Sequence, residues 1–382
     1  MIRTNLKGLT LSELEAYALA LGEKSYRGKQ LFTWLYTREA STFAGMTTLS
    51  KALREKLSAE AQIDSLTLLN RQVSRDDGTT KYLFGLSDGK SIESVLIPPR
   101  TAFNGAEART EDEQRRLTLC VSTQAGCPLD CAFCATGTMG FLRNLTAGEI
   151  VDQVLQSKHL AGRQITNLVY MGMGEPLLNY DPVMKSIEII TAGMAIATRR
   201  ITVSTAGLVP QIRKMADERR RMKLAVSLHS LDQHRRAELM PIARKYGIEE
   251  LLGAVSYYYQ KVKLRPTLEY ILFDEWNDRD EDIDRLVKTA RRIPCKINLI
   301  PFHSIAFTNP SGFASALRPT APSRMDEFVR RLHEVHLTVF VRSSAGEDID
   351  AACGQLAVAA QGTGRSTNRP HGLKRSSSAV RV

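Results

Sequence analysis

Residues 117–136, LTLCVSTQAGCPLDCAFCAT, join a short apolar run to three cysteines within eight positions. The run LTLCVS has the composition of a buried β-strand, and Cys127, Cys131 and Cys134 follow it closely. Thiolates are the usual ligands of iron–sulfur clusters. Zinc sites usually pair two cysteine arms or add histidines, and no histidine lies within twenty residues of this motif. The spacing therefore favours a [4Fe–4S] cluster with one iron open to another ligand.

Outward from this motif, residues 117 to about 342 alternate between strand-like and helical patterns. The strand-like runs are LTLCVS, NLVYMG, ITVST, KLAVSLH, TLEYILF and KINLIPF, and helical stretches such as AGEIVDQVLQSKHL stand between them. Repeated β-then-α units predict an α/β fold with a parallel sheet. About six units suit a partial (β/α)6 barrel of the TIM type better than a closed barrel of eight. In such barrels the active site gathers at the carboxyl ends of the strands.

Unusual residues stand at these strand ends. They are Gly174 and Glu175 in MGMGEP, Ser204 in STAG, Ser227, Leu228 and His229 in SLH, and Asn298 in INLIPF. A glycine lets the backbone approach a ligand closely, and Glu175 offers an acceptor to an ammonium group. A turn before a helix, or buried polar residues bonded to backbone, would produce the same letters. Their gathering at one rim is what favours a binding site.

Three further regions flank the barrel. Residues 1–62 predict a small helical domain whose first helix could be capped by Ser12 and Glu15. Its basic residues Lys29, Arg38, Lys51, Arg54 and Lys56 could grip a nucleic acid backbone, although a plain helical cap on the main domain explains them equally well. Residues 63–116 predict a short antiparallel β meander and a mobile polar loop over 98–116. Barrel and C-terminal segment then occupy 117–360, and residues 361–382, a basic tail without acids, predict disorder.

Composition indicates the partner and the location. A net charge of +11 and a pI of about 9.4 favour an acidic partner, of which nucleic acid is the commonest. Single basic pairs such as Arg235-Arg236 would suit solvated helix faces. No apolar run reaches the roughly 18 residues of a membrane span, and residues 1–17 lack the apolar stretch of a secretion signal. A cytoplasmic monomer is expected.

The cysteine motif, with an aromatic residue before its third cysteine, resembles the signature of the radical S-adenosylmethionine (SAM) superfamily. The resemblance implies that SAM chelates the open iron. One electron from the cluster then cleaves SAM to a 5′-deoxyadenosyl radical. The strand-end residues Gly174, Glu175, Ser204, Ser227, Leu228, His229 and Asn298 are then expected to contact SAM.

Two more cysteines narrow the resemblance. Cys120 lies on the first strand and Cys353 lies in IDAACGQL. The stretches TLCVSTQAGCPLDCAFCATG and GEDIDAACGQLA resemble those of the 23S rRNA adenine C2 methyltransferases, some of whose members also modify tRNA. The match runs from about residue 90 to 360, with weaker similarity in the N-terminal helices.

This resemblance implies a ping-pong reaction that uses two SAM molecules. The first SAM methylates Cys353, and the radical from the second removes a hydrogen from the S-methyl group. The carbon radical adds to C2 of an adenine. Cys120 then attacks Cys353 to form a disulfide and release the methylated base. Transfer through Cys353 is needed because C2 of adenine is electron-poor and cannot attack the methyl group of SAM directly.

The resemblance also assigns Glu93, in SIESVLIP, as the base that takes the C2 proton, with a surface strand glutamate as the alternative. Cys295 is expected to be a buried core thiol. Partners implied are 23S rRNA, tRNA and an electron donor of the flavodoxin kind. At His303-Ser304-Ile305 many relatives have an asparagine, which leaves fine substrate preference open.

Two other functions stay open. An adenine C8 methyltransferase of 23S rRNA would share the cluster and both reactive cysteines. A non-catalytic iron–sulfur RNA-binding protein would need neither Cys120 nor Cys353.

Overall fold

A parallel sheet forms the centre of the computed structural model, which describes residues 3–99, 111–342 and 344–358. Its parallel strands in the described chain are β6 (Thr118–Cys120), β9 (Asn167–Tyr170), β10 (Ile201–Thr205), β11 (Lys223–Ser227), β12 (Thr267–Leu272), β13 (Lys296–Pro301) and β14 (Val339–Val341). Each pairs with the next one along the chain. The strands β6 and β9 to β13 lie on the six apolar runs of the sequence, and β14 extends the sheet at one edge.

The β meander belongs to the same sheet. Strands β3 (Thr67–Val73), β4 (Thr80–Gly85) and β5 (Ser91–Ile97) are antiparallel, and β5 pairs with β6 through Val95 opposite Cys120. The sheet therefore has ten strands within the described residues. Sequence patterns predicted meander and barrel as separate regions, because a pattern indicates that a strand exists but not which edge it pairs with. A small hairpin, β7 (Gln124–Gly126) and β8 (Phe141–Asn144), follows β6.

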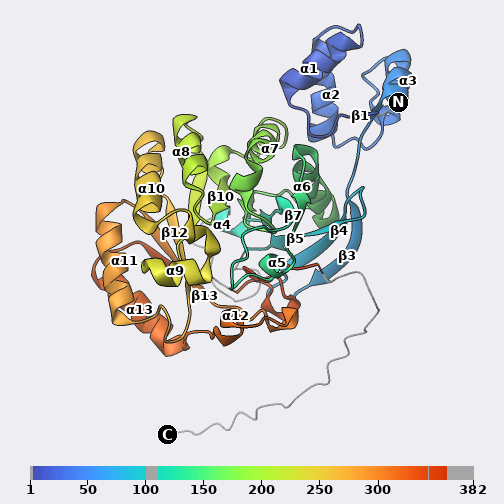
Figure 1. Cartoon of the computed structure of the whole chain (residues 1–382). Coiled ribbons are helices and arrows are strands. Elements are labelled where there is room, and N and C mark those ends of the chain that lie inside the picture. Colours follow the sequence, from blue (N-terminus) through green and yellow to red (C-terminus); the bar gives the residue numbers. More distant parts are fainter. Residues whose placement is uncertain (1–2, 100–110, 343, 359–382) are drawn as a thin grey trace, which may run out of the picture.

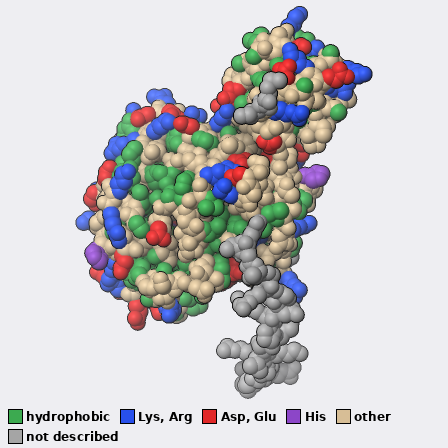
Figure 2. Space-filling model, turned by 45° about the vertical axis from the view of Figure 1, so that its right-hand side comes forward, with side chains coloured by type: hydrophobic (Ala, Val, Ile, Leu, Met, Phe, Trp, Pro, Cys, Tyr) green, Lys and Arg blue, Asp and Glu red, His purple; other side chains and the backbone are tan. Residues whose placement is uncertain are grey.

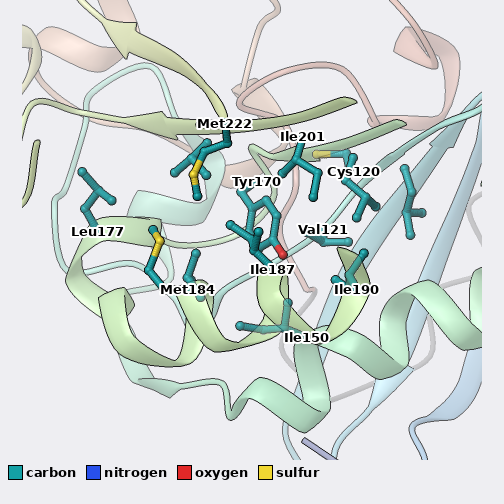
Figure 3. Packing of buried hydrophobic residues seen from close by; sticks show 14 of the residues in the cluster. Cys120, Val121, Ile150, Tyr170, Leu177, Met184, Ile187, Ile190, Ile201 and Met222 are labelled. Atoms are coloured by element: carbon teal, nitrogen blue, oxygen red, sulfur yellow. The ribbon is translucent and has the colours of Figure 1, made fainter. Parts of the chain in front are cut away.

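Helices form an arc outside the parallel strands (Figure 1). The longer ones are α6 (Ala147–Ala161), α7 (Tyr180–Gly193), α8 (Val209–Asp217), α10 (Ile248–Val262), α11 (Asp280–Arg292) and α13 (Pro322–Glu334). Shorter ones are α4 (Glu111–Gln114), α5 (Ala135–Thr138), α9 (Gln233–Leu239) and α12 (Phe313–Ala316). Figure 3 shows Ile150 of α6 and Ile187 of α7 near Val121, which follows β6; all three are buried. This core leaves the carboxyl ends of the strands free for the site.

The N-terminal unit is helical, as the sequence indicates, and packs on α6 and α7 (Figure 1). It contains β1 (Thr4–Asn5), α1 (Leu11–Ala20), α2 (Tyr26–Phe32), α3 (Lys51–Glu60) and β2 (Ala61–Gln62). The capping box of α1 uses Thr10 and Glu13, so the expected pair Ser12 and Glu15 is wrong; Ser12 instead contacts the Thr10 hydroxyl. A buried ion pair of 2.7 Å between Lys7 and Asp152 joins the unit to α6.

Parts of two expectations lie outside the described residues. The loop predicted over 98–116 contains the short helix α4, and its residues 100–110 are not among those described. The tail predicted over 361–382 is likewise outside them. Across the described ranges, no helix combines the length and the apolar character that a membrane span requires.

Candidate active site

A cavity opens at the carboxyl ends of the parallel strands, where the barrel rule predicts a site. It holds about 800 Å³ of space when the open solvent at its mouth is included. Cys127, Cys131 and Cys134 form one side of it, and Cys353 and Gly354 also line it. The structure therefore brings together the two cysteine motifs that lie more than two hundred residues apart in the sequence.

The three cysteines lie on one loop, residues 127–134, called here the three-cysteine loop. Burial raises the pKa of the Cys127 thiol to about 12 and also raises those of Cys131 and Cys134, with the neighbouring thiols adding to the effect for Cys131. A bound cation reverses this, because it stabilises the thiolate. Among the described residues, no three His, Cys, Asp or Glu side chains converge on a point where one metal ion could sit. Thiolates are the usual ligands of iron–sulfur clusters, so the chemistry of this donor set fits a [4Fe–4S] cluster.

Gly174 and Glu175 lie between β9 and the 3-10 turn Pro176–Asn179, and both line the cavity. Gly174 has φ +94°, and a Cβ there would lie 2.5 Å from the Gln124 Cβ, so only glycine fits. The Glu175 carboxylate accepts from the backbone amides of Leu177 at 3.0 Å and Ala206 at 2.7 Å. Burial nevertheless raises its pKa to about 7. Glu175 thus holds two strand ends together at the cavity wall.

Three polar residues predicted at the strand ends also line the cavity: Ser204, Ser227 and His229. His229 is fully buried and packs edge-on against Phe133 of the three-cysteine loop. Its Nδ1 accepts from the Ile271 amide at 3.0 Å, and burial lowers its pKa to about 3. The imidazole is therefore neutral with its proton on Nε2, which leaves one donor for a ligand.

Two of the expected contacts are placed differently. Leu228 is fully buried in the core and does not line the cavity; its amide donates to the Glu269 carbonyl and its carbonyl accepts from Arg236. Its side chain packs in the hydrophobic core instead of facing the cavity. Asn298 is one step removed from the cavity, since its amide donates to the Glu269 carboxylate at 2.6 Å and Glu269 forms the wall.

Cys120, at the end of β6, and Cys353 are both free thiols. Burial, and then the nearby Cys353, raise the pKa of Cys120 to about 12. The guanidinium of Arg342 lies near both sulfurs, and Cys353 is the main reason that the pKa of Arg342 exceeds its usual value. Arg342 also donates to the Met171 thioether at 3.1 Å. Arg342 opposes the rise in the pKa of Cys120, because a nearby cation stabilises the thiolate that nucleophilic attack requires.

Residues 344–358, called here the Cys353 segment, have little regular structure, and side chains and backbone groups from elsewhere hold them. Ala135, directly after the three-cysteine loop, donates its amide to Gly354 at 2.6 Å, and Thr136 donates its hydroxyl to the Leu356 carbonyl at 2.6 Å. Gly354 adopts φ +84°, and a Cβ there would lie 3.2 Å from the Phe133 carbonyl. Glycine therefore allows the segment to pack against the loop.

Glu93 lies behind the cavity wall. It is 5% exposed on β5, so the alternative of a surface glutamate is wrong. Its carboxylate pairs with Lys81 at 3.4 Å and accepts from the Ala357 amide at 3.1 Å. Burial raises its pKa above the usual carboxylate value, and Lys81 opposes the rise. Cys295 is buried, as expected of a core thiol.

Sequence reasoning missed three charged residues at this site. Arg342 directly follows β14, Glu269 lies within β12, and Arg236 is 1% exposed. Arg236 donates to the carbonyls of Ala206 and Ser227 and so ties β10 to β11, which makes the expected solvated Arg235-Arg236 pair wrong for Arg236. A charged residue inside an apolar strand or at its carboxyl end is the signal that could have found Glu269 and Arg342.

Comparison with known proteins identifies the family. Residues 121–287 match the radical SAM superfamily, and residues 4–63 match the N-terminal domain of ribosomal RNA large subunit methyltransferases. The dual-specificity RNA methyltransferase RlmN of Syntrophobacter fumaroxidans is 44% identical over 92% of this chain and 97% of its own length. The chain belongs to the RlmN family. The RlmN of Geobacter sulfurreducens is also 44% identical, over 92% of this chain and 91% of its own.

A solved relative agrees with this. A radical SAM methyltransferase from Sphaerobacter thermophilus superposes with a TM-score of 0.81 at 40% identity, covering 92% of this chain and 99% of its own. Membership of the RlmN family makes the chain a SAM-dependent RNA methyltransferase with a radical SAM fold, whose cofactors are a [4Fe–4S] cluster and SAM. In this chain, the thiols of the three-cysteine loop are the donors that suit the cluster.

Proposed function

We propose that the protein methylates C2 of an adenine in 23S rRNA, and of an adenine in some tRNAs, through an S-methylcysteine at Cys353. The observation that carries the proposal is that Cys353 and Arg342 line the same cavity as the three-cysteine loop, with Cys120 at the end of the first parallel strand, β6. A protein that only bound RNA would have no use for two free thiols and a half-buried arginine at that point.

Each residue is assigned one task. Cys127, Cys131 and Cys134 would hold the cluster, and Gly174, Glu175, Ser204, Ser227 and His229 would contact SAM. When bound, these groups supply a methyl group and a radical able to remove a hydrogen atom. Cys353 carries the carbon to the base through its sulfur, and Cys120 then closes a disulfide with Cys353 as the methylated base leaves. Glu93 takes the C2 proton.

Leu228 and Asn298 lie beside the cavity wall, and Glu269 and Arg342 line it. That Leu228 and Asn298 also contact SAM stays a prediction. We further propose that the sheet and its arc of helices form the partial (β/α)6 barrel predicted from the sequence. Support comes from the sequential parallel pairing of β6 to β13, which is the connectivity of such barrels.

RNA would reach the cavity from its open mouth, with the adenine turned out of its stack. Figure 2 shows Lys and Arg side chains over both the N-terminal unit and the main domain, interspersed with acidic ones. Such a surface would contact phosphates, so binding should weaken as salt rises. We propose that the N-terminal unit takes part in these phosphate contacts.

We also propose that the protein works in the cytoplasm as a monomer and that a flavodoxin-like protein supplies its electrons.

The test is anaerobic incubation of the reconstituted protein with SAM, a reductant and either 23S rRNA or tRNA, followed by mass spectrometry of the nucleosides. We expect 2-methyladenosine, which a Cys353→Ala variant does not form. An 8-methyladenosine product would keep the mechanism and change the position of transfer. If SAM is cleaved but neither RNA is methylated, the proposed substrates are wrong.

A further inference from the structure

Lys81 is a buried cation that lines neither the cavity nor the three-cysteine loop. It lies on β4 with its side chain 9% exposed. Its Nζ lies 3.4 Å from Glu93 Oε1 and donates to the backbone oxygen of Asp350 at 3.1 Å. Burial of an ammonium group is unfavourable unless the group is paired and hydrogen-bonded. A cation at this position therefore needs a reason beyond packing.

The strand register places Lys81 on the same face as the reacting residues. Lys81 is opposite Val95 of β5, and Val95 is opposite Cys120 of β6. Residues directly opposite each other share a face of the sheet, and alternate residues along a strand return to it, so Glu93 lies on this face as well. Lys81, Glu93 and Cys120 thus occupy one face across three neighbouring strands.

The Cys353 segment crosses this face and is attached on both sides of its cysteine. Lys81 binds the carbonyl of Asp350, three residues before Cys353, and Glu93 Oε2 accepts from the amide of Ala357, four residues after it. The Lys81–Glu93 ion pair links the two side chains that make these attachments. One buried pair therefore fixes both ends of the turn that presents the sulfur.

We propose that Lys81 is a positioning residue for methyl transfer: it holds the Cys353 segment and the Glu93 carboxylate in one network on the sheet. The proposal rests on the function proposed above for Cys353 and Glu93. Lys81 touches neither the base nor SAM in this account and acts only through these two groups.

The charges around Glu93 give the proposal a second consequence. Burial raises the pKa of Glu93, and the charge of Asp350 raises it too. Lys81 lowers this pKa through its charge and its hydrogen bond, and the Ala357 amide lowers it as well. A general base must be ionised, so transfer falls as the pH drops through this pKa. Without Lys81 the pKa of Glu93 rises further, so the acid limb of the pH profile moves to higher pH.

The experiment compares three substitutions of Lys81 with a matched control. Lys81→Met removes charge and hydrogen bonds, Lys81→Gln keeps a donor without the charge, and Lys81→Arg keeps both. Lys90→Met is the control, since Lys90 lies in the turn after β4 and its half-buried side chain pairs with Asp88, away from the Cys353 segment. Methylated adenosine and 5′-deoxyadenosine are measured against pH in the full protein, and hydrogen exchange is measured over residues 346–358.

We expect Lys81→Met to transfer methyl about tenfold more slowly at neutral pH and to form more 5′-deoxyadenosine per methyl group. The acid limb of its pH profile should move to higher pH, and the backbone amides of its Cys353 segment should exchange hydrogen faster. Lys81→Gln should also move the acid limb, but hydrogen exchange over its Cys353 segment should be slower than in Lys81→Met. Lys81→Arg should resemble the native protein in both measurements.

A native pH profile and native exchange in Lys81→Met would overturn the proposal, and so would equal losses in all three variants at every pH. If Lys81→Met does not fold, the Gln and Arg variants decide the outcome. If the native protein methylates no adenosine, the proposed function has failed, and exchange over the segment still decides whether Lys81 holds it.

Discussion

The three-cysteine loop and the Cys353 segment both present thiols to one cavity, but they are held there in different ways. The loop lies between β7 and α5, and its bonds include contacts within its own stretch, such as the Cys134 amide to the Cys131 carbonyl at 3.0 Å. The segment depends on residues far away in sequence, among them Asp77, Lys81, Glu93 and Thr136. Three thiols within eight positions indicate a shared site by their spacing alone, whereas the sequence linked Cys353 to that site only through a family resemblance. The contacts that hold the Cys353 segment are visible only in the tertiary structure.

The largest effect should come from breaking the local region. Cys131→Ser removes one of three soft ligands, so cluster binding, SAM cleavage and methyl transfer should all be lost, the last by at least about 10³-fold. Iron content, 5′-deoxyadenosine and methylated adenosine measure the three losses. Cys295→Ser is the matched control, and a Cys131→Ser protein that kept its iron and activity would remove the loop from the site.

The next effect separates the segment from the loop. Cys120→Ala leaves the cluster and the methylation of Cys353 intact, but no thiol remains to close the disulfide that frees the base. We expect turnover to fall about 10²-fold or more, and a covalent protein–RNA adduct to accumulate. A shifted band on a denaturing gel, sensitive to ribonuclease, would report it. Free methylated RNA at the native rate would contradict the role given to Cys120.

A smaller change tests the contact between the two regions. Thr136→Val keeps the shape but removes the hydroxyl that binds the Leu356 carbonyl. The buried carbonyl then lacks its donor, which costs about 1–3 kcal/mol. SAM cleavage should continue while less methyl reaches RNA. The ratio of 5′-deoxyadenosine to methylated adenosine measures this, and an unchanged ratio would mean that the contact only supports the fold.

The smallest effect concerns the edge of the segment. Asp77 accepts from the Gly346 amide at 3.0 Å, and although burial acts against it, hydrogen bonds from Thr79, Ser74 and Gly346 keep the pKa of Asp77 below its usual value. Asp77→Asn should lower the free energy of unfolding by about 1 kcal/mol and transfer by less than threefold. Because this carboxylate stabilises the fold only when ionised, the difference should shrink as the pH falls through the lowered pKa. Thermal unfolding at neutral and acid pH tests both statements.

Several properties of this protein could be predicted from sequence. Apolar runs at regular intervals indicated the parallel strands, since period and length are local properties. Cys127, Cys131 and Cys134 indicated a cluster because three thiols in eight positions can share one loop. Strand ends pointed to Gly174, Glu175, Ser204, Ser227 and His229, all of which line the cavity.

Only the tertiary structure decided the rest. It paired β5 with β6, which put Glu93 and Lys81 on the same face as Cys120. It also buried Arg236, packed Leu228 into the core, and placed Arg342 at the cavity that Cys353 lines. The physical reason is range. Hydrophobic periodicity acts over a few residues, but burial, register and charge pairing depend on groups that meet only when distant strands close into one sheet.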